Sequence, residues 1–252
     1  MKTILAIAKN TFRETLRDKI LYTILGFALV FIISDIFFAA IANNDTAMVK
    51  SFGLAAIYLF GTVITIFLAS SIIYKEIERR TLYFVLSKPV SRAHVILGKF
   101  AGLLAAIVLT ILLMTVVYLA VVLVSGAGFD YMALVAVFFQ LLEAGLFIAI
   151  LVFFSSFLAP LPSILSATML LFVGHMLPTA LANIKVIGGP LYGFAKGAYY
   201  ILPNLEKFNV RNLVVHDLGV SSSVLFVTVA YGVLYSSLLL IAAVYIFKKR
   251  EL

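Results

Sequence analysis

The sequence contains no cysteine, no tryptophan and few charged residues. Asp, Glu, Lys and Arg make up 12% of its 252 residues, whereas a soluble domain usually has about 25%. Without cysteine the chain can form no disulfide, thiolate metal site or lipid-modified cysteine. The three histidines (His94, His175 and His216) are too far apart in sequence to form a metal-binding pair on one helix. We therefore expect no cofactor or metal bound by this chain.

Hydrophobic residues are abundant instead, at 64% of the chain. Burial in a soluble core cannot account for so few charges, so most of the chain is expected to lie in lipid. The net charge of +8 falls in clusters between apolar runs, which is the pattern of a membrane topology signal and not of a nucleic-acid-binding face. Tyrosines near the span ends can fill the interfacial aromatic positions, at Tyr22, Tyr74, Tyr131 and Tyr245.

Six apolar runs are long enough to cross a bilayer. They cover about residues 20–42, 53–74, 96–124, 131–158, 163–182 and 223–247. Each has the ~20 residues needed for a ~30 Å hydrocarbon core, and each must be helical because lipid offers its backbone no other hydrogen-bond partners. The first run is too long for the ~7–15-residue core of a cleaved signal peptide. The sequence thus predicts an all-α polytopic membrane protein, with residues 1–252 forming a single transmembrane domain.

Lysine and arginine favour one orientation of these spans. With the N-terminus inside, the inner segments carry 14 of the 19 basic residues and the outer segments carry 5. The excess of basic residues predicts that both termini are cytoplasmic. The uncharged turn "APLPS" between the fourth and fifth spans does not alter this prediction.

Residues 1–19 are predicted to form an amphipathic helix in the inner membrane interface. Apolar side chains recur every four residues on one side and basic side chains on another, at Ile4, Ala8, Phe12 and Leu16 and at Lys9, Arg13 and Arg17. Such a helix lies with its cations toward anionic headgroups. The alternative is a charged tail that only flanks the first span.

The outer loop, residues 183–222, is the longest connection. It is rich in aromatics, glycine and proline, and its apolar parts are too short to span. We expect short helices at the outer interface, either as a cap over an exit path or as an ordinary packed loop.

Residues 78–99 are the most polar long stretch of the chain, and residues 75–95 connect the second and third spans. Lys75 to Leu86 favours a helix whose apolar part, "TLYFVL", is too short to span and should bury against this protein or a partner. The helix should end near Ser87, because Pro89 disfavours the α conformation before it. Ser87 or Ser91 can then cap the next helix. This helix–turn–helix suits transmission of a push from a cytoplasmic partner; the alternative is a charged loop that only fixes topology.

The next span begins with "GKFAG", residues 98–102. This G-x-x-x-G spacing permits close helix packing. The motif is common by chance and does not identify the helix that would pack there.

The polar segment resembles the cytoplasmic coupling segment of type-2 ABC exporter permeases. The matching residues are Glu78, Arg79, Arg80 and Thr81, then Leu86, Ser87, Pro89, Val90, Ser91 and Arg92, then Gly98 and Lys99. The family usually has glycine where Arg80 stands, so a flexible joint is not expected there. Further segments are similar to the permeases of multicopper-enzyme maturation, including the one serving nitrous oxide reductase: Glu143, "SSF" at 155–157, "GHM" at 174–176 and "LPNLEKF" at 202–208.

The resemblance implies a bacterial inner-membrane exporter in which two permease chains pair and each docks one ATP-binding subunit. ATP and Mg²⁺ would bind that partner, because this chain has no phosphate-binding loop. A periplasmic accessory protein is a further expected partner. The residues expected to couple to the ATPase are Glu76, Glu78, Arg79, Thr81, Leu82, Phe84, Leu86, Ser87, Pro89, Val90, Ser91, Arg92 and Lys99.

Four polar residues within the spans are further candidates, because ionisable groups are costly at membrane depth. Glu143 lies near the middle of the fourth span with Gln140 one turn away. It is expected to line a substrate path, relay a proton or hydrogen-bond between helices. For His175, which precedes Pro178, an interhelical hydrogen bond is favoured over a ligand role. Asp35 is nearer the outer end of its span, where we expect it to reach water.

Three function classes remain. The leading one is the permease subunit of an ABC exporter. The second is an ATP-driven mechanical or assembly component that acts on an outer partner without moving a solute. The third, an intramembrane enzyme, is disfavoured because Glu143 and His175 are the only deep titratable pair and no acidic or histidine-rich motif accompanies them.

Overall fold

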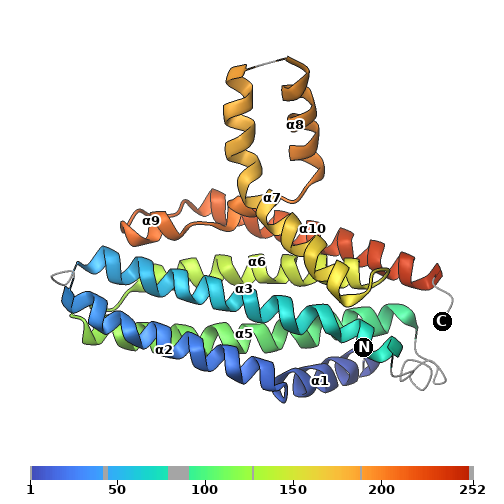
Figure 1. The fold of residues 1–252 in the computed structure, drawn as a ribbon, viewed down its shortest axis with the longest axis horizontal. Helices are drawn as coiled ribbons and strands as arrows, with labels where there is room; N and C mark the ends of the chain where they lie inside the picture. The colour runs from blue at the N-terminus through green and yellow to red at the C-terminus, as the bar shows by residue number, and fades with distance from the viewer. Residues whose placement is uncertain (1, 42–44, 79–90, 127, 188, 250–252) are drawn as a thin grey trace.

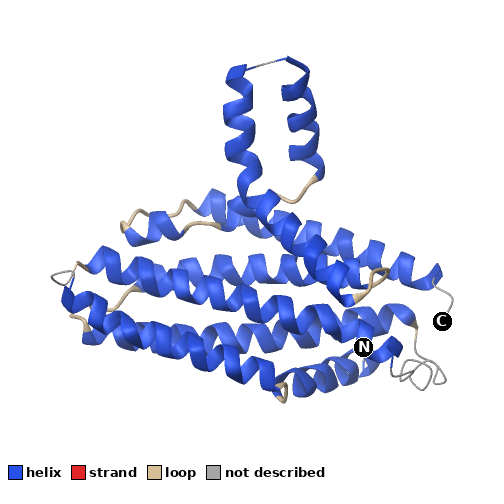
Figure 2. Cartoon of the chain, in the orientation of Figure 1, coloured by secondary structure: helices blue, strands red, loops and turns tan. Residues whose placement is uncertain are grey.

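The computed structural model describes residues 2–41, 45–78, 91–126, 128–187 and 189–249. Throughout these ranges the regular structure is entirely helical (Figure 2). Six helices are long and apolar enough to cross a membrane, which confirms the predicted all-α polytopic fold. They are α2 (Lys19–Ile41), α3 (Thr46–Glu78), α5 (Arg92–Val124), α6 (Tyr131–Ser155), α7 (Pro160–Ile187) and α10 (Ser222–Lys249).

The shorter helices flank these spans. The N-terminal segment forms α1 (Lys2–Leu16), and the region between α7 and α10 forms α8 (Gly189–Ile201), η1 (Leu205–Phe208) and α9 (Arg211–Val215). Short helices were expected in both places. The α7 helix begins at Pro160, although its two prolines had suggested a turn up to residue 163. Proline is well tolerated in the first helical turn, because the N–H groups there have no intrahelical partner.

The long helices α2, α3, α5 and α6 lie side by side with their axes roughly aligned, and α10 crosses behind α7 (Figure 1). The start of α1, the end of α3, the start of α5 and the end of α10 lie at one end of this bundle, and α9 lies at the other. We call these the termini end and the α9 end. The core is built mainly from α3, α5 and α6, whose inner faces are fully buried.

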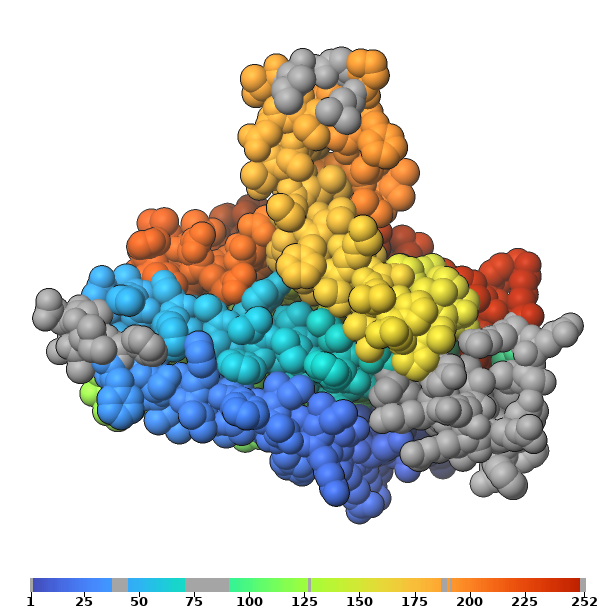
Figure 3. Space-filling model, viewed as in Figure 1, coloured from blue at the N-terminus to red at the C-terminus, as the bar shows by residue number. Residues whose placement is uncertain are grey.

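The second half of α7 and all of α8 form a hairpin that stands crosswise to the bundle (Figures 1 and 3). Pro178 lies inside α7, and proline kinks a helix because it removes one backbone hydrogen bond. The hairpin does not lie over the α9 end of the bundle (Figure 1), and a cap over an exit path stays a prediction. Near the α9 end, α9 packs on α6 and α3, and η1 packs on α6 and α7.

Helix α1 packs against the G-x-x-x-G at the start of α5. A Cβ on Gly98 would lie 2.7 Å from Cβ of Ile7, and one on Gly102 would lie 2.5 Å from the carbonyl oxygen of Ala8. Thr11 of α1 is buried at the same contact. The backbones of α1 and α5 therefore approach as closely as the small-residue motif allows.

The opposite side of α1 remains exposed, including the three regularly spaced basic residues at Lys9, Arg13 and Arg17. Its contact with lipid headgroups stays a prediction. The helix is fixed to the protein in any case, because it packs along the first turns of α5.

We expect Gly102→Leu to displace α1 from α5, because the new side chain would overlap the α1 backbone. Overpacking of this kind costs about 1–3 kcal/mol, measurable as a lower melting temperature of the purified chain in detergent. Gly26→Ala in α2 is the matched control, since a Cβ there meets nothing within 4 Å. Equal melting temperatures for Gly102→Leu and wild type would contradict this packing.

Candidate functional site

A cluster of polar side chains joins α3, α6 and α7 within the bundle. Glu143 of α6 is only 5% exposed. Its Oε1 accepts a hydrogen bond from the Tyr58 hydroxyl at 2.9 Å and lies 2.9 Å from Nε2 of His175. The Tyr58 hydroxyl is also 2.8 Å from that histidine nitrogen. Three helices therefore meet at one triangle of hydrogen-bonding atoms.

The cluster continues from the triangle toward the α9 end. Nδ1 of His175 lies 3.0 Å from Oε2 of Glu206 in η1. The amide of Asn209 donates to the other oxygen of Glu206, and Nε of Arg211 donates to the Asn209 side chain. The Arg211 guanidinium then lies 3.9 Å above the Tyr58 ring. We call these six residues (Tyr58, Glu143, His175, Glu206, Asn209 and Arg211) the polar network.

Groups of opposite charge character contact each other in the network. Two carboxyl groups flank one imidazole, and Arg211 adds a cation over the tyrosine face, an arrangement that is favourable when partly desolvated. Both ring nitrogens of His175 have an oxygen partner, so the ring orientation is fixed. Buried polar groups need such partners, because each unpaired one costs free energy.

Gly174 brings η1 close to His175. A Cβ at Gly174 would lie 2.7 Å from the carbonyl oxygen of Pro203 and 3.0 Å from Leu205. The "GHM" and "LPNLEKF" segments thus pack directly on each other. This contact places Glu206 within reach of the α7 histidine.

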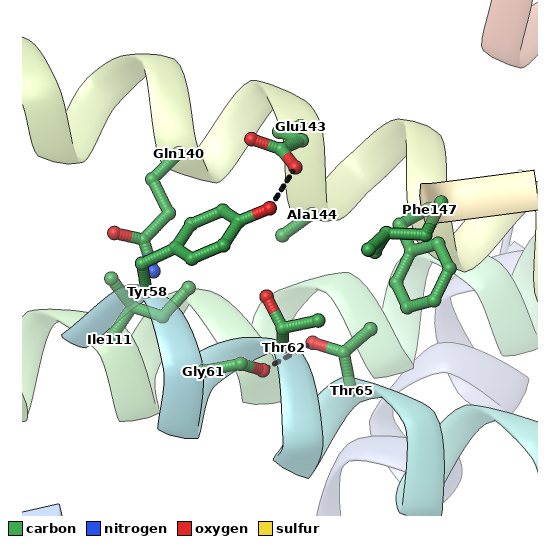
Figure 4. Close-up of a pocket in the computed structure, with 10 residues that line it drawn as sticks. Tyr58, Gly61, Thr62, Thr65, Ile111, Gln140, Glu143, Ala144 and Phe147 are labelled. Atoms are coloured by element: carbon green, nitrogen blue, oxygen red, sulfur yellow. Dashed lines mark hydrogen bonds between the residues drawn. The ribbon is translucent and has the colours of Figure 1, made fainter. Parts of the chain in front are cut away.

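A small pocket lies beside the network between α3, α5, α6 and α7 (Figure 4). Its lining combines polar and apolar side chains: Tyr58, Gly61, Thr62, Thr65, Ile111, Gln140, Glu143, Ala144, Phe147 and Leu171. Gln140 does not bond to Glu143; its amide donates to the Ile57 carbonyl at 3.0 Å. Gln140 therefore ties α6 to α3 one turn away from the network.

The sequence identified Glu143, Gln140 and His175 but missed the other partners. Nothing in the sequence singled out Tyr58 as a site residue, because several other tyrosines also lie within the spans. Glu206 and Arg211 lie in a loop, and only the return of that loop onto α7 brings them to the site. Within the described ranges, no group of three His, Asp or Glu side chains is arranged to hold a metal ion.

Asp35 is fully buried, which corrects the expectation that it reaches water. Neither of its carboxyl oxygens has a hydrogen-bond partner among the described residues. The side chain points toward Gly53 of α3, where Tyr118 of α5 also packs. These neighbours seal Asp35 from solvent although it lies near the end of its span.

A second polar group, close to Asp35, was not anticipated from the sequence. Asp130 caps α6 by accepting from the Ala133 amide and also accepts from the Tyr118 hydroxyl at 2.8 Å. Lys50 lies 3.7 Å from Asp130 and 2.9 Å from the exposed Asp217. These contacts hold the starts of α3 and α6 together at the α9 end.

The expected ATPase-coupling residues fall into three sets. Most lie outside the described residues: Arg79, Thr81, Leu82, Phe84, Leu86, Ser87, Pro89 and Val90. Glu76 and Glu78 belong to the last turns of α3. Ser91 caps α5, as one of the two expected capping serines, by accepting from the His94 amide. Arg92 begins α5, and the Lys99 side chain is buried.

The triangle predicts strong coupling between Glu143 and His175. In a double-mutant cycle of Glu143→Ala and His175→Ala, we expect an interaction energy of about 1–3 kcal/mol, because the groups are in direct contact. The measurement is unfolding of the purified chain in mixed micelles. Glu143→Ala combined with His94→Ala, in the first turn of α5, is the control and should be additive. Additivity in the first cycle would show that the contact adds no stability.

Replacing each buried aspartate by asparagine should change the stability of the chain differently. Asp130→Asn removes the negative charge that faces Lys50 and one of two acceptor oxygens, and should destabilise the chain by about 1–3 kcal/mol. Asp35→Asn removes a carboxyl group that has no partner among the described residues, so its melting temperature should be no lower than that of wild type. A marked drop for Asp35→Asn would indicate that the carboxylate binds a cation.

Comparison with known proteins agrees with this architecture. Residues 5–252 match the family described as ABC-2 family transporter protein. No curated protein matches the chain significantly. Because the match covers nearly the whole chain, including α1, all six long helices and the polar network, the protein belongs to the ABC-2 transporter family and is a membrane-spanning permease component of an ABC transporter.

Proposed function

We propose that this chain is the permease subunit of an ABC exporter, driven by a separate ATP-binding subunit that docks on residues 75–95. The observation that carries the proposal is the family match over residues 5–252. The fold supports it, because α3 ends and α5 begins at the same end of the bundle as both chain termini (Figure 1). That end carries most of the basic residues and is the cytoplasmic one in this proposal.

The complex would contain two permease chains and two ATPase subunits in a bacterial inner membrane. ATP and Mg²⁺ would bind the ATPase, and this chain would supply the conducting helices. In this proposal a polar cargo would pass the polar network, because the network places hydroxyl, carboxyl and imidazole groups among apolar helices.

A role in metalloenzyme maturation follows from the narrower resemblance. Three of its four segments meet in the structure: Glu143 and His175 are in contact, and Glu206 of "LPNLEKF" bonds to His175. The fourth segment, "SSF", does not join them: it lies at the end of α6, where the Ser155 hydroxyl is 3.0 Å from that of Ser163. The convergence of the other three supports a common role for their residues.

A mechanical or assembly role is the second candidate. The α7–α8 hairpin favours it, because it stands away from the bundle and presents exposed side chains such as Phe194 and Tyr200 to a partner. An outer protein bound to the hairpin would feel movements of α7 without any solute crossing the membrane.

Co-purification tests the ATPase partner. With a C-terminal tag in the native host and mild detergent, we expect a stoichiometric ATP-binding subunit to accompany the wild-type chain. Changing Leu82, Phe84 and Leu86 to Ser should remove it, because these apolar side chains are proposed to bury against the partner. The control is Leu213→Ser at the α9 end, where the leucine is 41% exposed.

Two outcomes would contradict the proposal. A folded wild-type preparation without any ATPase would remove the energy source. Retention of the ATPase by the triple variant would place the docking surface elsewhere on the chain.

A further inference from the structure

The first residue of α5 is bound to the last turn of α10. Nη1 of Arg92 donates to the carbonyl oxygen of Phe247 at 2.6 Å and to that of Lys248 at 3.1 Å. The guanidinium carbon also lies 5.8 Å from the centre of the Phe247 ring. Arg92 therefore joins two helices whose contacting residues are 155 positions apart in sequence.

The chemistry of this contact makes it directional and strong. The last carbonyls of a helix have no intrahelical donor and carry partial negative charge. A guanidinium at that point satisfies two of them with charge-assisted hydrogen bonds. The Phe247 side chain is fully buried, so the end of α10 is held by packing as well.

Arg92 is also held firmly within α5. Ser91, directly before it, accepts from the His94 amide, and its hydroxyl lies 2.8 Å from Nδ1 of His94. The first turn is thereby closed around Arg92. About two turns later, α1 packs against Gly98 and Gly102. The start of α5 is thus attached to α10 by Arg92 and to α1 by the glycines.

We propose that Arg92 is a positioning residue that passes movement of the coupling segment to α10. The segment is continuous in sequence with the start of α5, and the Arg92 contact makes the end of α10 follow that start. The sixth span would then respond to nucleotide together with the third, although it has no sequence connection to the segment. This inference rests on the proposed function, because it requires an ATPase that moves residues 75–95.

The absence of cysteine from this chain provides a direct test, because a single introduced cysteine is then its one site for a spin label. Cysteines of the ATPase subunit are blocked or replaced before labelling. One label goes on α10 at Ile241→Cys, where the side chain is 66% exposed, and another on α5 at Leu97→Cys, 37% exposed. Each is placed in the wild-type complex with its co-purified ATPase, in nanodiscs. Spectra are compared with and without ATP and vanadate.

We expect nucleotide to change the spectrum at both positions in the wild type. In Arg92→Gln the change at Ile241→Cys should be lost, while that at Leu97→Cys remains. Two charge-assisted hydrogen bonds are lost. The equilibrium constant between α10 attached to the start of α5 and α10 detached from it should therefore change by about tenfold or more. Arg92→Lys keeps a cationic donor and should retain a response at Ile241→Cys. Arg13→Gln in α1, an exposed basic residue, is the control for charge loss and should behave as wild type.

Different results would contradict the role of Arg92 and the proposed function. Equal responses at both labels in wild type and Arg92→Gln would overturn the role of Arg92 while leaving the ATPase coupling intact. A wild-type complex with no response at Leu97→Cys, or a chain without an ATPase, would overturn the proposed function and this inference with it. A retained Leu97→Cys response shows that Arg92→Gln is folded and bound to its partner. Loss of both responses in Arg92→Gln would place Arg92 in the ATPase-docking surface and overturn its role as a positioning residue.

Discussion

Polar side chains inside an apolar bundle can be stabilised only by one another, and the position of α7 depends on this constraint. Most of α7 faces away from the core, yet His175 bonds to Glu143 of α6 and to Glu206 of η1. Gly174, its neighbour, lets η1 approach the same turn. One turn of α7 therefore fixes the helix against α6 and folds the following loop back onto it. Beyond this turn α7 leaves the bundle as part of the hairpin.

The α5 helix connects the two polar ends of the molecule. At the termini end, Arg92 binds α10, and Gly98 and Gly102 contact α1. At the α9 end Tyr118, near the other end of α5, donates to Asp130 and covers Gly53 of α3. The helix runs without a break over 33 residues between these contacts. A helix of that length spans about 50 Å, so a displacement at its start can be transmitted along the bundle as a rigid body.

The fold could be predicted from hydropathy because lipid leaves an apolar run of twenty residues no structure other than a helix. Which side chains meet could be predicted only in part. Periodicity does not give helix rotation, so Asp35 appeared to reach water although the structure buries it against α3 and α5. The small-residue motif at Gly98 indicated a close approach but not that α1 would occupy it. Glu206 needed the folded loop, which no local pattern encodes.

The packing of α1 on Gly98 and Gly102 of α5 has a consequence for synthesis of the chain. Helix α1 leaves the ribosome before α5, and Gly98 and Gly102 follow some ninety residues after Ile7 and Ala8. At roughly 5–20 residues per second this interval lasts about 5–20 seconds. During that time the amphipathic helix has no seat on α5, and its cations and apolar side chains are available to the membrane surface. Insertion of α5 then supplies the surface on which α1 packs, so α1 can dock only after the third span has been made.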